Sequence, residues 1–185
     1  MLGSPIAHSL SPVLHRAAYQ ALGLAGWSYR AIECDEARLP GLLGQCGPDW
    51  AGLSLTMPLK RAVLPLLDEV EPVATEAGAA NTVVFSGGRR HGYNTDVPGM
   101  ISALAEAGAT GGLGDVLILG AGATACSALA AVRGLGGKAV TVAVRDQAKA
   151  TDLLAAAGRL AVETRLVDFD NPGIGPPDLL ISTVP

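Results

Sequence analysis

One stretch in the middle of the chain constrains the fold more than any other. Residues 116–119 read Val-Leu-Ile-Leu, four consecutive apolar residues that are typical of a strand buried on both faces of a parallel sheet. A turn with the pattern Gly-x-Gly-x-x-Ala follows at residues 120–125, and an alanine-rich helical pattern comes after it. Strand, glycine turn and helix in this order form the dinucleotide-binding fingerprint. The stretch therefore predicts an α/β unit with a parallel sheet, the alternative being an ordinary glycine turn in such a sheet.

The positions of this turn have distinct predicted roles. Gly120 permits the tight turn, Gly122 lets the backbone approach a pyrophosphate, and Ala125 allows the helix to pack closely on the strand. Backbone N–H groups at the start of the helix then point at the phosphates. The predicted cofactor-binding segment comprises the whole turn, namely Gly120, Ala121, Gly122, Ala123, Thr124 and Ala125.

The second half of the chain continues with the alternation that a parallel sheet with right-handed crossovers requires. We predict strands at 115–119, 138–144, 161–167 and 178–183, and helices at 123–135 and 147–157. The second of these strands ends in Arg145 and Asp146, where a contact to the cofactor ribose is expected. Arg145 suits a 2′-phosphate and hence NADP, whereas Asp146 suits a free 2′-hydroxyl and hence NAD. A guanidinium can clamp a phosphate, which favours NADP.

The first half of the chain predicts another α/β unit. Gly108 to Gly114 is rich in glycine and is interpreted as the link between the halves, with the domains at 1–99 and 100–185. The patterns predict helices from Ser11 to Gly23, at 35–46, from Pro58 to about Leu67 and at 97–107, strands at 27–33, 51–55 and 79–85, and a hairpin turn at Gly87-Gly88.

Polar residues of the first half stand where these elements begin or end. Such positions gather into a site in an α/β fold, and a lysine with a carboxylate there suits acid–base catalysis. Lys60 lies in the first turn of a predicted helix, where a cation opposes the helix dipole at a cost of about 0.3–1 kcal/mol. Some of these residues also have a purely structural interpretation. Lys60 could be a solvated surface lysine, and Ser11 and Asp96 could be helix caps. No such structural role is evident for Ser9. The candidate residues are Ser9, Ser11, Thr56, Lys60, Asn81, Asn94 and Asp96.

Composition excludes several classes of protein. A net charge of -4 and an aromatic content of 4% argue against a nucleic-acid partner. No apolar run reaches the roughly 18 residues that a membrane span needs, and the first residues do not form a signal peptide. The cysteines are isolated in the sequence and indicate a reduced, cytoplasmic protein, and the histidines lack metal-ligand spacing, so no metal site is expected. The oligomeric state, monomer or homodimer, is left open.

Six segments carry recognisable motifs, in order along nearly the whole chain: residues 3–12, 53–60, 78–82, 92–96, 120–125 and 144–146. Together they resemble the motifs of the shikimate dehydrogenase family. The family motifs N-V-T-x-P-x-K, G-A-x-N-T, G-x-N-T-D and N-R-T have counterparts here, although Val144 and Asp146 replace the last motif's asparagine and threonine.

The resemblance implies an enzyme that uses NADPH to reduce 3-dehydroshikimate to shikimate on the route to aromatic amino acids. It assigns Ser9 and Ser11 to the substrate carboxylate, Thr56, Asn81 and Asp96 to the ring hydroxyls, and Lys60 with Asp96 to proton transfer. Arg145 would hold the 2′-phosphate. The family places its substrate between a substrate domain and a Rossmann-type nucleotide domain.

The same resemblance leaves two alternatives. Asp146 favours oxidation of quinate with NAD. The resemblance also implies that segments of the family are missing here. We expect these to be part of the first strand, the later strands of the nucleotide domain, its C-terminal helices and a substrate-binding glutamine. An incomplete nucleotide domain is therefore expected, which favours poor activity or a non-catalytic remnant.

Overall fold

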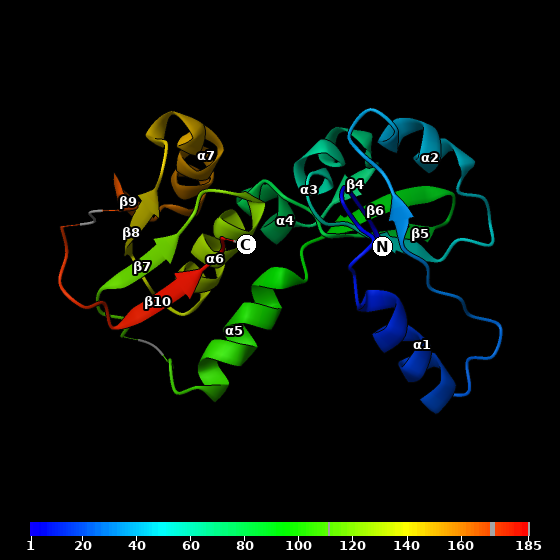
Figure 1. Cartoon of the computed structure of the whole chain (residues 1–185), viewed down its shortest axis with the longest axis horizontal. Coiled ribbons are helices and arrows are strands. Elements are labelled where there is room, and N and C mark those ends of the chain that lie inside the picture. Colours follow the sequence, from blue (N-terminus) through cyan, green and yellow to red (C-terminus); the bar gives the residue numbers. More distant parts are fainter. Residues whose placement is uncertain (111, 171–172, 185) are drawn as a thin grey trace. The chain divides into compact units, whose positions relative to one another are not determined.

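The computed structural model describes residues 1–110, 112–170 and 173–184, which fall into two compact units. Unit 1 comprises Met1–Val70 and Ala80–Tyr93, and unit 2 comprises Glu71–Ala79 and the chain from Asn94 onward. Figure 1 labels elements of both units where there is room. Residues 94–99 and the described part of the glycine-rich stretch 108–114 lie in unit 2.

Unit 1 is built on short strands of mixed direction. β1 and β2 pair in parallel, while β3 and β6 each pair antiparallel with β5, and β4 adds to β6 in parallel. A bridge between Leu2 and Leu55 joins the two sets of strands. The strands are β1 (Leu2–Gly3), β2 (Ile32–Glu33), β3 (Gly52–Ser54), β4 (Glu69–Val70), β5 (Thr82–Ser86) and β6 (Arg89–Tyr93), and the helices are α1 (Ser11–Ala21), α2 (Leu39–Gln45), α3 (Leu59–Ala62) and the 3₁₀ helix η1 (Leu64–Leu66).

Two glycine predictions in unit 1 are confirmed. Gly87 and Gly88, at φ 58° and 74°, form the two-residue turn between β5 and β6. Positive φ at both positions matches the right-handed twist of the paired strands. Gly23 adopts a φ of 68° directly after the helix end at Leu22, as expected for a glycine stop.

Prolines and short pairing partners explain where unit 1 departs from expectation. The strand predicted at 27–33 forms only at Ile32–Glu33, because β1 offers two residues for pairing. The helix predicted at 35–46 begins at Leu39, so that Pro40 lies in its first turn. The helix predicted from Pro58 to Leu67 divides into α3 and η1, because Pro65 lacks an N–H and its ring clashes with the preceding turn.

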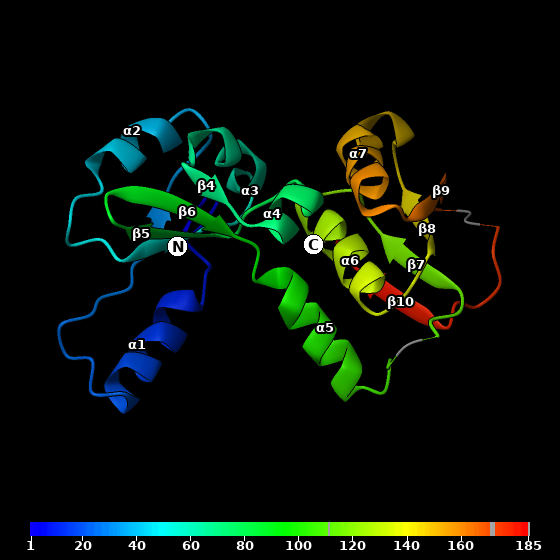
Figure 2. The ribbon, with the colours of Figure 1, turned by 180° about the vertical axis from the view of Figure 1, so that it is seen from behind.

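Unit 2 confirms the parallel sheet. Its strands lie in the order β10-β7-β8-β9, and every pairing is parallel. The strands are β7 (Val116–Leu119), β8 (Ala139–Val144), β9 (Glu163–Asp168) and β10 (Leu179–Ser182), and the helices are α4 (Pro72–Ala77), α5 (Asp96–Glu106), α6 (Ala123–Gly134), η2 (Gln147–Ala150) and α7 (Thr151–Leu160). Figure 2 shows these elements from behind.

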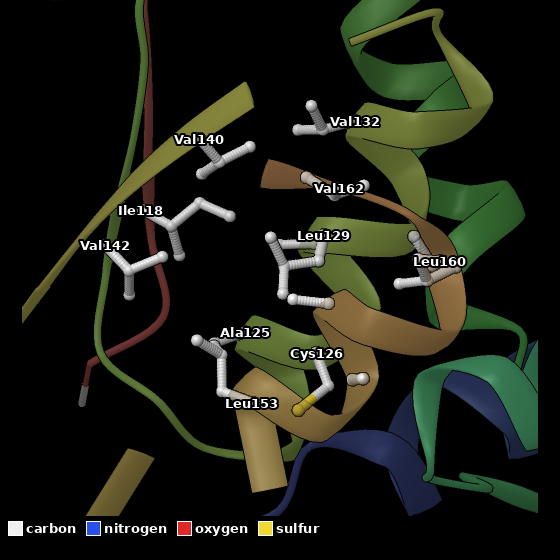
Figure 3. Packing of buried hydrophobic residues seen from close by; sticks show 14 of the residues in the cluster. Ile118, Ala125, Cys126, Leu129, Val132, Val140, Val142, Leu153, Leu160 and Val162 are labelled. Carbon is white, nitrogen blue, oxygen red and sulfur yellow. The ribbon is translucent and has the colours of Figure 1, made fainter. Parts of the chain in front are cut away.

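The core of unit 2 lies between this sheet and α6. Ile118, Val140 and Val142 point from the strands toward Leu129 of α6 and Leu153 of α7 (Figure 3). A helix that is apolar all round must be buried, and residues 125–132 of α6 are buried without exception. Alternate strand residues form a smaller cluster on the other face, made of Leu117, Ala143 and Val167, against which Phe169 and Ile174 pack.

The short helix α4 was not predicted, because six residues show no clear periodicity. It ends at Gly78 in the left-handed conformation, φ 66°. Nε of Arg159 on α7 donates to the carbonyl of Glu76 at 2.9 Å. A cation near the end of a helix satisfies its last carbonyl groups, so Arg159 attaches residues 71–79 to unit 2.

Candidate functional site

The glycine turn of unit 2 has the conformation that the fingerprint requires. Gly120 has a φ of 99°, and its N–H donates to the carbonyl of Ala143 at 2.9 Å. A Cβ at this position would lie 2.9 Å from Oγ1 of Thr183 and 3.1 Å from Cγ1 of Val184. Both backbone conformation and space therefore exclude a side chain at Gly120.

This turn lies where the strand order of unit 2 reverses. From β7 the chain passes to β8 and β9 on one side, and β10 pairs with β7 on the other. Ligands of open α/β sheets bind beside the carboxyl ends of the strands at such a switch point. Oγ1 of Thr183, just after β10, donates to the carbonyl of Leu119 at 2.6 Å and so holds the two strand ends together.

The far side of the turn is open. Gly122 is exposed, and a Cβ built on it would meet no atom within 4 Å. It precedes α6 with extended backbone, and Ala125, fully buried, begins the packing of α6 in the core. Open space at a glycine beside the first turn of a helix fits the approach of a phosphate group, so these residues suit a dinucleotide.

Arg145 and Asp146 follow the carboxyl end of β8. Arg145 is exposed there. Asp146 has a structural function, because its Oδ1 accepts from the N–H of Ala148 at 3.1 Å and caps η2. The capping role weakens the argument that Asp146 is present to hold a ribose hydroxyl.

In unit 1, two loops predicted to bind substrate lie against each other. The N–H of Ser4 donates to the carbonyl of Met57 at 2.9 Å, and the N–H of Thr56 donates to the carbonyl of Leu2 at 2.9 Å. Gly3 allows this approach, because a Cβ there would collide with Cγ2 of Thr56. Both loops contain a cis proline, Pro5 and Pro58.

Asn81 and Lys60 join the same region through their backbones. The carbonyl of Asn81 accepts from the N–H of Leu55 at 2.7 Å, and the carbonyl of Lys60 accepts from the N–H of Ala80 at 2.8 Å. The side-chain oxygen of Asn81 accepts from Oγ1 of Thr82 at 3.0 Å. Unit 1 therefore brings the backbone around Thr56, Lys60 and Asn81 together. Lys60 lies in a helix of only four residues, which weakens the dipole argument.

The expectation for Ser9 and Ser11 is corrected. Ser11 is the first residue of α1 and not its cap, and the residue before it, Leu10, makes no side-chain capping bond. Instead Oγ of Ser9 accepts from the N–H of Ser11 at 3.3 Å. Ser9, for which no structural role was expected, thus supports the start of this helix, because a serine oxygen can accept from a free N–H of the first turn.

Glu33 has a role that the sequence does not predict. Its Oε2 accepts from the N–H of Ile6 at 3.0 Å. The hydroxyl of Ser4 and this N–H both favour the charged carboxylate and hold the pKa of Glu33 below its ordinary value. Glu33 therefore ties the loop at residues 4–6 to β2. No local pattern signals this role, because the partners lie 27 residues apart.

The expected cap at Asp96 is also corrected. Asp96 lies within the first turn of α5, and the capping oxygen comes from Asn94. Oδ1 of Asn94 accepts from the N–H groups of Asp96 at 3.1 Å and Val97 at 3.3 Å. Asp96, the glycine turn and Arg145 belong to unit 2, whereas Ser9, Ser11, Thr56, Lys60 and Asn81 belong to unit 1.

Other features of the molecule add nothing to this site. A groove of about 740 Å³ beside β3 and β5 contains none of the predicted site residues, so we do not assign the reaction to it. Across residues 1–110, 112–170 and 173–184, no three His, Cys, Asp or Glu side chains gather as metal ligands. Within the same ranges, no helix is long and apolar enough to cross a membrane.

Comparison with known proteins gives the same result as the motifs. The family described as "Shikimate dehydrogenase substrate binding domain" matches residues 1–83. The crystal structure of Mycobacterium tuberculosis shikimate dehydrogenase is similar to all of this chain, with 44% identity and a TM-score of 0.84, and the match covers 68% of that structure. This chain belongs to the shikimate dehydrogenase family. The resemblance inferred from the motifs is therefore confirmed.

Other members of the shikimate dehydrogenase family match over shorter parts of their length. "Shikimate dehydrogenase (NADP(+))" of Thermus thermophilus is 43% identical over 146 residues, which is 79% of this chain and 50% of that protein. The Geobacter sulfurreducens protein of the same name is 38% identical, over 89% of this chain and 58% of its own. The chain thus spans about half the length of these curated relatives. A Thermus thermophilus structure in complex with NADP(H) and shikimate has a TM-score of 0.83 at 37% identity, over 99% of this chain and 66% of that structure.

Proposed function

We propose that this protein interconverts 3-dehydroshikimate and shikimate with NADP(H), in the biosynthesis of aromatic amino acids. The observation that carries the proposal is the paired arrangement in unit 1, where the loop after β1 lies against the loop that leads to Lys60. Family membership adds that relatives are named shikimate dehydrogenase (NADP(+)), and one is solved with NADP(H) and shikimate.

The chemistry that a bound nicotinamide supplies is hydride transfer to the substrate carbonyl carbon. The carbonyl oxygen then needs a proton, and we assign its delivery to the ammonium group of Lys60. Asp96 is proposed as the partner of Lys60 in this acid–base pair. Thr56 and Asn81 are proposed to orient the ring hydroxyls together with Asp96, and the hydroxyls of Ser9 and Ser11 to bind the substrate carboxylate.

The cofactor is proposed to be held by the turn of residues 120–125, with Arg145 at the 2′-phosphate. Replacing Arg145 by alanine should raise KM for NADP⁺ by about tenfold or more and leave KM for NAD⁺ unchanged, because only NADP⁺ carries that phosphate. Steady-state kinetics with both nucleotides measures this, and Arg133→Ala on exposed α6 surface is the matched control. Equal effects on the two nucleotides would contradict the assignment of Arg145.

The activity itself is tested by a rate matrix of shikimate and quinate against NADP⁺ and NAD⁺, followed by nucleotide reduction, on the complete natural polypeptide. The proposal predicts that shikimate with NADP⁺ gives the highest kcat/KM. A maximum for quinate with NAD⁺ would support the alternative that Asp146 favours. Absence of turnover in every combination would identify a non-catalytic protein.

We further propose that the protein acts in the cytoplasm. The cysteines support this, because Cys34, Cys46 and Cys126 form no disulfide within the part of the chain that the structure describes. Cysteines that remain thiols are typical of a reducing compartment.

A further inference from the structure

Two buried polar side chains of unit 2 are bonded to each other. Asn94 is 1% exposed and Ser127 is fully buried, and no other polar or charged residue in the described part of the chain is buried to this degree. Nδ2 of Asn94 donates to Oγ of Ser127 at 2.9 Å. Buried polar pairs that are fully satisfied fix one arrangement of the elements that carry them, because breaking the pair leaves a costly unpaired group.

The remaining hydrogen bonds of the Asn94 amide go to Ala79 and to the start of α5. Nδ2 donates a second bond to the carbonyl of Ala79 at 2.9 Å. Oδ1 accepts from the N–H groups of Asp96 and Val97. The position of the Asp96 backbone is therefore set by the same amide group that binds Ser127.

Ser127 connects this amide to the helix that follows the glycine turn. Its Oγ donates to the carbonyl of Ala123 at 3.3 Å, in the first turn of α6. The single hydroxyl hydrogen of Ser127 is used in the bond to the carbonyl of Ala123. The hydroxyl oxygen accepts the hydrogen bond from Asn94. A directed series of hydrogen bonds thus joins the segment of Asp96 to the segment next to Gly122.

We propose that Asn94 and Ser127 are positioning residues that hold Asp96 at a fixed place relative to the glycine turn. The inference rests on the proposed function, in which Asp96 takes part in proton transfer and the turn holds the cofactor. Neither side chain needs to touch substrate or cofactor. Their role is to prevent α5 and α6 from shifting along each other at the end where Asp96 and Gly122 lie.

The first test is Ser127→Ala in the complete natural polypeptide, with Ser102→Ala on exposed α5 surface as the matched control. Ser127→Ala should lower kcat for shikimate oxidation about tenfold and leave KM for NADP⁺ within about twofold, because the turn is also held by β7 and Thr183. Ser102→Ala should change neither constant. An unchanged kcat in Ser127→Ala would overturn the proposal.

A double-mutant cycle with Asp96→Asn separates positioning from general stability. If Ser127 acts through Asp96, Ser127→Ala should change kcat less than about twofold in the Asp96→Asn background. The same tenfold loss in both backgrounds would show an effect independent of Asp96 and overturn the inference. An unaltered kcat in Asp96→Asn alone would instead refute the proposed role of Asp96, which is a distinct failure.

A second variant covers the case in which Ser127→Ala does not fold. Asn94→Ser retains an oxygen that can cap α5 but is too short to bind both Ala79 and Ser127. We expect it to keep a cooperative unfolding transition and to show the same tenfold loss of kcat, again with KM for NADP⁺ nearly unchanged. A folded Asn94→Ser protein with wild-type kcat would overturn the proposal.

Discussion

Lys60 is the residue on which the proposed chemistry depends most directly. It follows Leu59 in the one-turn helix α3, and its carbonyl is held by the N–H of Ala80. Lys60→Ala should lower kcat by roughly 10²–10⁴-fold, the usual contribution of general acid–base catalysis, with little change in KM for shikimate. Steady-state kinetics of shikimate oxidation measures this.

Lys138→Ala is the control for Lys60→Ala, since Lys138 is an exposed lysine of unit 2. It should have no effect on kcat. If Lys60→Ala turned over shikimate at the wild-type rate, Lys60 would have no part in the proton transfer.

Glu33 makes a pH-dependent contribution to the stability of the folded protein. Its pKa is lowered in the folded protein, first by the Ser4 hydroxyl and then by the Ile6 N–H. The stabilisation is therefore fully present above the unfolded pKa, about 4.3, and is lost as the pH falls through the lower folded pKa. The difference in Tm between wild type and Glu33→Gln should accordingly be largest near pH 7 and shrink below about pH 4.

Thermal unfolding of both proteins between pH 7 and pH 3 measures this contribution. Glu106→Gln, on exposed surface of α5, shows the general effect of removing one carboxylate. A difference in Tm that stays constant over the whole range would mean that the charge of Glu33 does not hold the loop at residues 4–6.

At the scale of elements, the turn between β7 and α6 offers two glycines with different requirements. Gly120→Ala forces a side chain into the left-handed region and against Thr183, so it should lower the free energy of unfolding by about 1–2 kcal/mol. Gly122→Ala meets open space at an ordinary φ of −75° and should leave stability within about 0.5 kcal/mol.

The same pair of variants separates stability from binding. Gly122→Ala should weaken NADP⁺ binding by about tenfold, because the added methyl group occupies the space proposed for a phosphate. Denaturant unfolding and calorimetric titration measure the two effects. Unchanged nucleotide affinity in Gly122→Ala would exclude close approach of a phosphate to this glycine.

At the scale of the whole molecule, stability of unit 2 depends on one core shared by sheet and helices. Leu129 is fully buried between them, whereas Leu154 on α7 is 42% exposed. Leu129→Ala should cost about 2–5 kcal/mol in the free energy of unfolding. Leu154→Ala should cost less than about 1 kcal/mol. Denaturant unfolding measures both, and equal losses would contradict the central place of α6 in this core.

Each of the two units is made of two separate stretches of the chain, which makes the domain limits hard to predict from the sequence. Residues 71–79 belong to unit 2, although unit 1 residues precede and follow them. Ala77 packs in the core of unit 2, and Arg159, more than eighty residues further along the chain, bonds to the carbonyl of Glu76. A local pattern carries no information about such a partner. The strand at Glu69–Val70 and the helix α4 were missed for a related reason, because elements this short are defined by what they pair with.

Elements with local signals can be predicted from the order of the amino acids alone. The strand, glycine turn and helix at 116–134, the parallel alternation after it and the hairpin at Gly87-Gly88 follow from periodicity and from backbone freedom at glycine. Thr56, Lys60 and Asn81 are candidate residues because they stand at the ends of predicted elements, and their roles stay predictions. The hydrogen bonds that cap helices and hold loops depend instead on tertiary contacts. The side chain of Asn94 caps α5, Ser9 supports the start of α1, and Glu33 holds the loop that contains Ile6. These roles depend on which groups meet in space and not on their order in the chain.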